Sequence, residues 1–183
     1  AEEVETEGHH DAVMLVQRRD APLSDVVSAM WANEDDGAVQ LLGCMSVGRC
    51  AEEAKNVSSP SDDDDDDIDD DGPTDELVSV ALLSLTALVN AMKNHPNEPA
   101  IQESACRALS SLAPADGRRE ISLSASGALP SAVAAMQAHV SDAVVQSSAC
   151  AALGEAVRRG GAERATVVAS VSGMTAVLNA MGA

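Results

Sequence analysis

Residues 91–106 of this chain read AMKNHPNEPAIQESAC, and the same pattern returns in residues 135–150, AMQAHVSDAVVQSSAC, and in residues 29–44, AMWANEDDGAVQLLGC. In each stretch a Gln follows the Met by ten residues, and a Cys follows the Gln by four. The three Met residues are 62 and 44 positions apart, and a fourth Ala-Met pair comes 45 positions later. The chain is therefore a series of units of about 44 residues, with one insertion of 18 residues.

Composition indicates that these units are helical. The 183 residues include no Phe, no Tyr and a single Trp, so a core must be built from Ala, Val, Leu, Ile and Met. Ala is the best helix former, whereas strands normally draw on aromatic side chains. The chain begins without Met and stops inside a unit. We therefore interpret it as a helical piece of a longer protein.

Residues 97–139 show how one unit is built. Ile101, Ala105 and Leu109 share one face of a predicted helix, which ends at the turn residues 114–117. A short helix around residues 121–125 and a third helix from Leu129 follow. Because no single helix can cover its own apolar stripe, burial must come from the neighbouring unit.

The register of the repeats divides the whole chain and predicts an all-α fold, an α-solenoid of stacked three-helix units. Such stacks bind other macromolecules far more often than they catalyse reactions. The expected segments are an acidic frayed terminus over 1–12, a partly degenerate first repeat over 13–57, an acidic insertion over 58–76, a second repeat over 77–113, a third over 114–158 and part of a fourth over 159–183.

Three stretches carry a resemblance to a known family. Residues 101–113, IQESACRALSSLA, residues 127–133, GALPSAV, and residues 145–153, VQSSACAAL, resemble the armadillo repeat. The resemblance covers nearly the whole chain apart from the first dozen residues and the insertion. It implies three helices per repeat, stacked as a right-handed superhelix.

In armadillo proteins the long third helices line a concave groove that receives extended peptides. The resemblance places these helices here at residues 36–50, 98–113 and 142–158. Family members that bind import signals or long acidic segments often present a Trp and, four residues later, an Asn from each third helix. In this chain the Trp positions hold Met45, Arg107 and Ala151. The Asn positions hold Arg49, Ser111 and Glu155.

Since neither position matches, the import-receptor function and its ligand residues are not transferred to this chain. A groove would instead be lined by a mixed set, which also fits ordinary solvated surface groups. The candidate partner-binding residues are Arg49, Arg107, Ser111 and Glu155.

The formal net charge of −19 is concentrated in the insertion. Its centre is a run of aspartates: Asp62, Asp63, Asp64, Asp65, Asp66, Asp67, Asp69, Asp70 and Asp71. Like charges at this density favour an extended, solvated loop. Two functional alternatives are attraction of a basic partner and occupation of the chain's own groove.

A calcium site is a third alternative for this run. Asp67, Asp69, Asp71 and Gly72 reproduce the first half of an EF-hand loop, but the twelfth position holds Val78, where a bidentate Glu is required. A run of aspartates produces such a match by composition alone. We therefore predict no metal site and no cofactor.

Nothing in the sequence indicates catalysis. The chain lacks a Gly-rich phosphate loop, a nucleophile elbow and a His-Glu-x-x-His motif. His95 and His139 follow Met92 and Met136 by three residues, which indicates imidazoles that complement the dipole at a helix C-terminus. We expect no catalytic residue, and we do not expect an enzyme.

Charge and hydropathy restrict the partners. An acidic chain without a basic stripe or an aromatic platform argues against nucleic acid. There is no signal-peptide pattern and no apolar run long enough to cross a bilayer, so no membrane partner is expected. The four Cys residues do not form a disulfide framework, which favours a reducing compartment, the cytoplasm or the nucleus.

The preferred hypothesis is a protein–protein interaction scaffold that presents a helical groove to a partner protein or an extended peptide. One alternative is the regulatory or targeting region of a larger enzyme, for example a kinase or a ligase. Another is an adaptor for basic peptides such as nuclear-import signals.

Overall fold

The computed structural model describes residues 2–57, 75–112 and 126–170, together with Thr175, Val177 and Ala180. Every regular element in these residues is an α-helix, which confirms the predicted all-α class for this part of the chain. The acidic residues Asp62 to Asp71 and the short helix expected at 121–125 lie outside the described residues. The helices are α1 (Glu2–Gln17), α2 (Leu23–Ala32), α3 (Gly37–Val57), α4 (Asp75–Asn94), α5 (Pro99–Leu112), α6 (Ala128–Ala138) and α7 (Ala143–Ser170).

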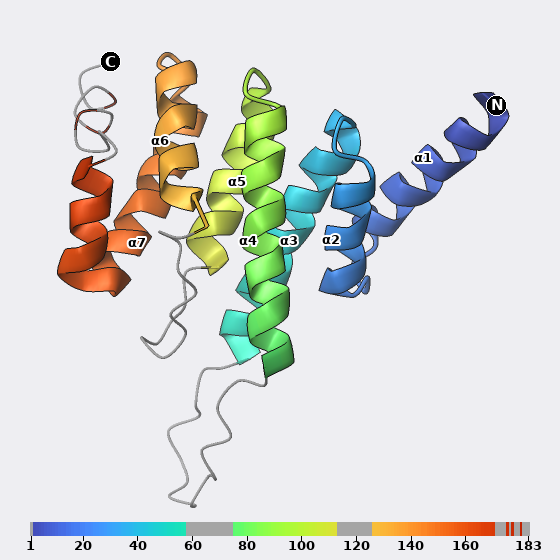
Figure 1. Cartoon of the computed structure of the whole chain (residues 1–183), viewed down its shortest axis with the longest axis horizontal. Coiled ribbons are helices and arrows are strands. Elements are labelled where there is room, and N and C mark those ends of the chain that lie inside the picture. The colour runs from blue at the N-terminus through green and yellow to red at the C-terminus, as the bar shows by residue number, and fades with distance from the viewer. Residues whose placement is uncertain are drawn as a thin grey trace, which may run out of the picture.

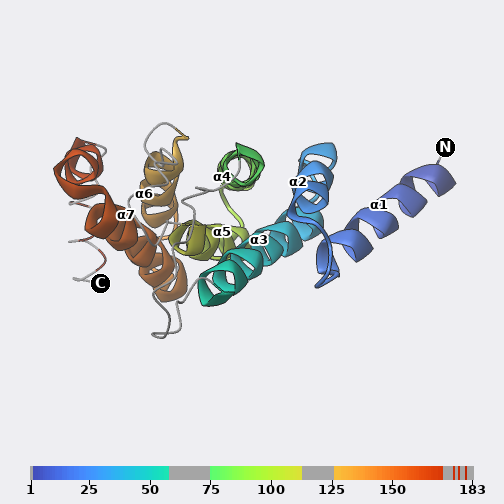
Figure 2. The ribbon, with the colours of Figure 1, turned by 90° about the horizontal axis from the view of Figure 1, so that it is seen from below.

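The helices lie in two layers. Figures 1 and 2 show α2, α4 and α6 side by side in one layer, while α1, α3, α5 and α7 form the other. Neighbouring helices within each layer contact one another, and so do the members of the pairs α2/α3, α4/α5 and α6/α7. The first three Ala-Met pairs therefore lie in even-numbered helices, and the Gln and Cys of each of these repeats lie in the odd-numbered helix that follows.

A continuous apolar core fills the space between the layers. It runs from Val16 in α1 through Leu88 and Leu109 to Ala156 in α7, all of them buried. Small side chains let the odd helices approach closely: a Cβ on Gly48 would lie 3.4 Å from the Cα of Ala108. This close approach explains how a core almost without aromatic residues can be well packed.

The core continues past α7. Ala180 occupies the repeat position of Ala29, Ala91 and Ala135, and it is helical and packed against the core. The three earlier alanines are buried, whereas Ala180 is half-buried. The alanine of the fourth Ala-Met pair thus packs against the same core but is less deeply buried.

One buried side chain explains the spacing of the repeated motif. The Nε2 group of Gln102 donates to the carbonyl oxygens of Met92 at 2.8 Å and His95 at 2.9 Å. The last carbonyls of a helix lack partners within that helix, and Gln102, in the first turn of the next helix, reaches back to satisfy two of them. The same pair of bonds joins Gln40 to Met30 and Asn33, and Gln146 to Met136 and His139.

We expect Gln102→Leu to lower the free energy of unfolding by about 1–3 kcal/mol, the cost of a buried unsatisfied polar group. Leucine has a similar size but no donor, so the carbonyl of Met92 would lose its partner, whereas that of His95 would keep the backbone N–H of Glu98 at 3.2 Å. Urea unfolding followed by circular dichroism measures the change. Gln137→Leu, at an exposed position of α6, is the matched control. Equal midpoints for the two variants would contradict this role.

Aspartates fix where two of the odd helices begin. The Oδ1 atom of Asp36 accepts from the backbone N–H groups of Ala38 at 2.9 Å and Val39 at 3.2 Å, and Asp142 caps α7 in the same way. All three odd helices of the pairs start within one residue of the expected position. α3 extends beyond its expected end, because residues 51–57, AEEAKNV, contain good helix formers and no breaker. α7 also extends beyond its expected end and continues through Gly160 and Gly161.

The N-terminal segment, expected to be frayed over residues 1–12, instead forms α1 from Glu2. α1 runs in the same direction as α3, as successive contacts along both helices show. The side chain of His9 pairs with Asp36, and the Oγ atom of Ser46 donates to the carbonyl of the buried Val16 at 2.5 Å. α1 therefore contacts α3 within the same layer, but less extensively than α3 contacts α5.

The loops between paired helices are linked by imidazoles. The Nε2 atom of His95 lies 2.8 Å from the carbonyl oxygen of Glu34, and that of His139 lies 2.9 Å from the carbonyl oxygen of Pro96. Both histidines follow a helix end, as the sequence indicated. Their rings, however, contact the preceding loop, so their observed role is to join one unit to the next.

Candidate functional site

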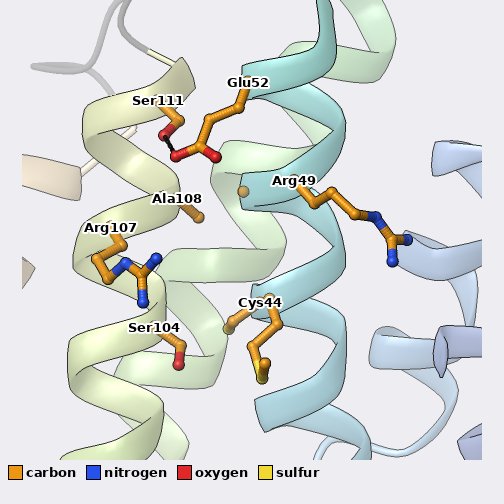
Figure 3. A pocket seen from close by; sticks show the side chains of 9 residues that line it. Cys44, Arg49, Glu52, Ser104, Arg107, Ala108 and Ser111 are labelled. Carbon is orange, nitrogen blue, oxygen red and sulfur yellow. Dashed lines mark hydrogen bonds between the residues drawn. The ribbon is translucent and has the colours of Figure 1, made fainter. Parts of the chain in front are cut away.

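A surface slot lies between α3 and α5, and we call it the α3/α5 slot. Its volume is about 120 Å³, below the roughly 300–1,000 Å³ of sites that enclose small molecules. The slot therefore has room for a single side chain of a larger ligand. Its lining residues, most of them labelled in Figure 3, are Cys44, Met45, Gly48, Arg49, Glu52, Ser104, Arg107, Ala108 and Ser111.

Small residues form the middle of the slot. Gly48 of α3 lies close against Ala108 of α5, and both line the slot, so no large side chain fills its middle. Met45 lies one turn earlier in α3 and is 56% exposed, which is unusual for a large apolar side chain. The slot thus offers an apolar surface that solvent reaches.

A fixed carboxylate lies at one end of the slot. Ser111 is buried, and its Oγ atom lies 3.2 Å from the Oε1 atom of Glu52 (Figure 3). A carboxylate can only accept, so the serine hydroxyl donates this bond. The bond joins α5 to α3 and orients the Glu52 carboxylate.

The two arginines of the slot are engaged elsewhere. Arg107 pairs with Glu103, one turn earlier in α5, with 3.5 Å between Nη1 and Oε1. The Nη2 atom of Arg49 donates to the carbonyl oxygen of Arg18 at 3.2 Å, and Figure 3 shows the guanidinium pointing away from Ser111 and toward the other side of α3. Arg49 therefore binds the end of α1 and contributes mainly its stem to the slot.

The candidate residues from the sequence separate into two places. Arg49, Arg107 and Ser111 all line the α3/α5 slot. Glu155 is not among the lining residues; it lies on α7, where its carboxylate accepts from Arg158 at 2.8 Å.

Sequence reasoning missed Glu52 and Gly48. Glu52 lies beyond the expected end of its helix, so the repeat register gave no signal for it. Gly48 had one: a helix-interior Gly is unfavourable, and the equivalent position of α7 is again a glycine, Gly154.

The thiols near the slot are unsuited to nucleophilic chemistry. Burial raises the pKa of Cys44 from 9.0 to about 12, and the nearby Cys106 adds to this shift. Burial likewise raises the pKa of Cys106 to about 12. Because the thiolate is the reactive form, both groups stay protonated and inert at neutral pH.

Comparisons with protein-family models, with curated proteins and with solved structures found no match for this chain. The armadillo resemblance therefore rests on the sequence motifs alone. Within the described ranges no group of three or more His, Cys, Asp or Glu side chains is placed to hold a metal ion. The described helices also include none that combines the length and apolarity needed to cross a membrane.

Proposed function

We propose that the chain is part of an armadillo-like α-solenoid and that its odd-helix layer binds an extended segment of a partner protein. The observation that carries this proposal is the α3/α5 slot, an open space of one-side-chain size with the exposed Met45 at its edge. The layered stacking of equivalent helices supports the solenoid, because each unit buries its apolar face against the next.

The spacing of the odd helices suits an extended ligand. Packed helices lie roughly 8–10 Å apart, and an extended chain advances roughly 3.3 Å per residue. In a bound segment that crosses the layer, about every third side chain would therefore lie at the next space between two odd-numbered helices. The equivalent exposed positions along its path are Met45, Arg107 and Ala151.

The slot favours binding over catalysis. Cys44, the one thiol among the lining residues, is protonated. The lining residues include no histidine that could activate either serine of the slot. The volume of the slot holds one side chain. Its lining combines the apolar Met45, Gly48 and Ala108 with charged groups, and protein interfaces likewise join an apolar centre to a polar rim.

Site-specific photo-crosslinking tests which layer binds partners. A benzophenone amino acid at Met45, 56% exposed, is compared with the same group at Leu82, 48% exposed in α4 of the other layer. In a cell extract we expect several-fold more crosslinked product from Met45. Mass spectrometry of the crosslinked peptides should locate one contiguous partner segment.

The two positions lie in different helix layers but have similar exposed fractions, so the yield at Leu82 measures crosslinking by random collision. Equal yields from both positions, or a larger yield from Leu82, would contradict binding by the odd-helix layer. Unlabelled wild-type protein in excess should suppress a specific crosslink at Met45.

A further inference from the structure

We infer, on the basis of the proposed binding role, that the α3/α5 slot seats one long basic side chain of the bound segment. The charged head of that side chain lies against Glu52, and its aliphatic stem lies along Met45 and over Gly48.

Glu52 is the one carboxylate among the lining residues, and no cationic side chain of the described residues pairs with it. Within the described part of the chain its only side-chain partner is the hydroxyl of Ser111. The positive charge of Arg107 is balanced by Glu103 on its own helix. Arg49 turns its guanidinium to the carbonyl of Arg18, away from the slot. A ligand that complements the unmatched group must therefore bring a positive charge.

Ser111 prepares this carboxylate for a cation. The serine is 8% exposed, so its hydroxyl has little freedom, and it occupies Oε1 of Glu52. The other oxygen, Oε2, keeps its full capacity to accept a hydrogen bond from a ligand. A carboxylate that is already oriented loses less side-chain entropy on binding than a free one.

The space beside Glu52 suits a methylene chain. Met45 is one turn before Gly48 and Glu52 follows one turn after it, so the three positions lie along one side of α3. Ala108 closes the floor from α5. Long basic side chains bury their aliphatic stems on apolar surface while the charged head stays in a polar setting. A stem over Gly48 would thus reach Glu52 from the Met45 end.

The overall charge of the chain acts in the same direction but does not select this site. A net charge of −19 attracts any cationic peptide and speeds its encounter. A test must therefore separate the slot from this general attraction. Glu53, an exposed neighbour that does not line the slot, provides the matched charge control.

The experiment titrates the protein with acetyl-(Ala-Lys)₃-amide and, in parallel, with acetyl-(Ala-Gln)₃-amide. Methyl NMR of the seven methionines reports where binding occurs, since Met45 borders the slot and the buried Met30 and Met92 serve as references. We expect the lysine peptide to move the Met45 signal. Glu52→Gln should weaken its Kd about tenfold, the effect of losing one charge-assisted hydrogen bond, and Glu53→Gln by less than about twofold.

The outcomes separate this inference from the proposed function. Equal weakening by Glu52→Gln and Glu53→Gln would show attraction by net charge alone and overturn the basic-side-chain site. Movement of Met45 by the glutamine peptide to the same extent would also overturn it, while leaving the binding layer intact. If neither peptide moves Met45 and the Met45 crosslink is absent as well, both the inference and the proposed function fail.

Discussion

Leu109→Asp should lower the free energy of unfolding by about 5 kcal/mol or more and melt the middle of the stack. Leu109 is 3% exposed on α5, the helix that contacts both α3 and α7. Losing the leucine side chain from a packed core costs about 2–5 kcal/mol, and an uncompensated buried charge costs about 3–5 kcal/mol more. Proteins have only about 5–15 kcal/mol of stability in total. Thermal unfolding followed by circular dichroism measures the change.

Two further variants separate the causes of this loss. Leu109→Ala removes the same packing without adding a charge, so its midpoint should fall between those of wild type and Leu109→Asp. Ala100→Asp places the same charge on an exposed position in the first turn of α5, where the helix dipole favours it, and should leave the midpoint unchanged or slightly raised. An unchanged midpoint for Leu109→Asp would refute the placement of Leu109 in the shared core.

The helical class and the helix starts could be predicted from the sequence because their causes are local. The stripe of Ile101, Ala105 and Leu109 needs only helical geometry, and all three residues are buried as expected. The helix ends were harder. α3 continues to Val57 because local helix propensity favours it. The repeat register assigns the helix only as far as residue 50 and contains no information on where the turns beyond that residue end.

The structural roles of the Gln and His residues that recur at fixed repeat positions could not be predicted from their spacing. Gln102 bonds to two carbonyls ten and seven residues earlier, and this depends on how the loop folds back between two helices. His95 depends even more on the tertiary arrangement, since its acceptor, Glu34, is 61 residues away. Spacing shows that a position matters to the repeat, whereas the contact partner is set by packing.

The candidate site shows the same division. Arg107 and Ser111 were selected by their place in the register, and they line the slot because equivalent helices present equivalent faces. Arg49 shares that register, yet α1 provides a carbonyl that draws its guanidinium away. A helix in that position could not be predicted, because residues 1–12 are mostly acidic and polar. Glu52 was missed because it follows the last residue that the register assigned to the helix.

Stability should fall as the pH rises above about 9, and the buried thiols of Cys44 and Cys106 should be the main cause. In the unfolded chain these thiols ionise near 9.0, whereas in the folded chain their pKa is about 12 because burial disfavours the thiolate. Between these values the unfolded state releases protons that the folded state retains. Their contribution is therefore complete below pH 9 and is lost between pH 9 and 12, at about 1.4 kcal/mol per pH unit for each thiol.

The composition makes the effect of the buried thiols easy to measure between pH 9 and 12. The chain has no Tyr, and Lys55 and Lys93 are its only lysines, so few other side chains titrate there. Urea unfolding at pH 8, 9, 10 and 10.5, in a reducing buffer, measures the slope. The Cys44→Ala/Cys106→Ala double variant should lose most of the pH dependence, whereas Cys50→Ala, on the same helix but only half-buried, should retain it. A slope that persists in the double variant would show that other groups cause the alkaline loss of stability and that the buried thiols do not.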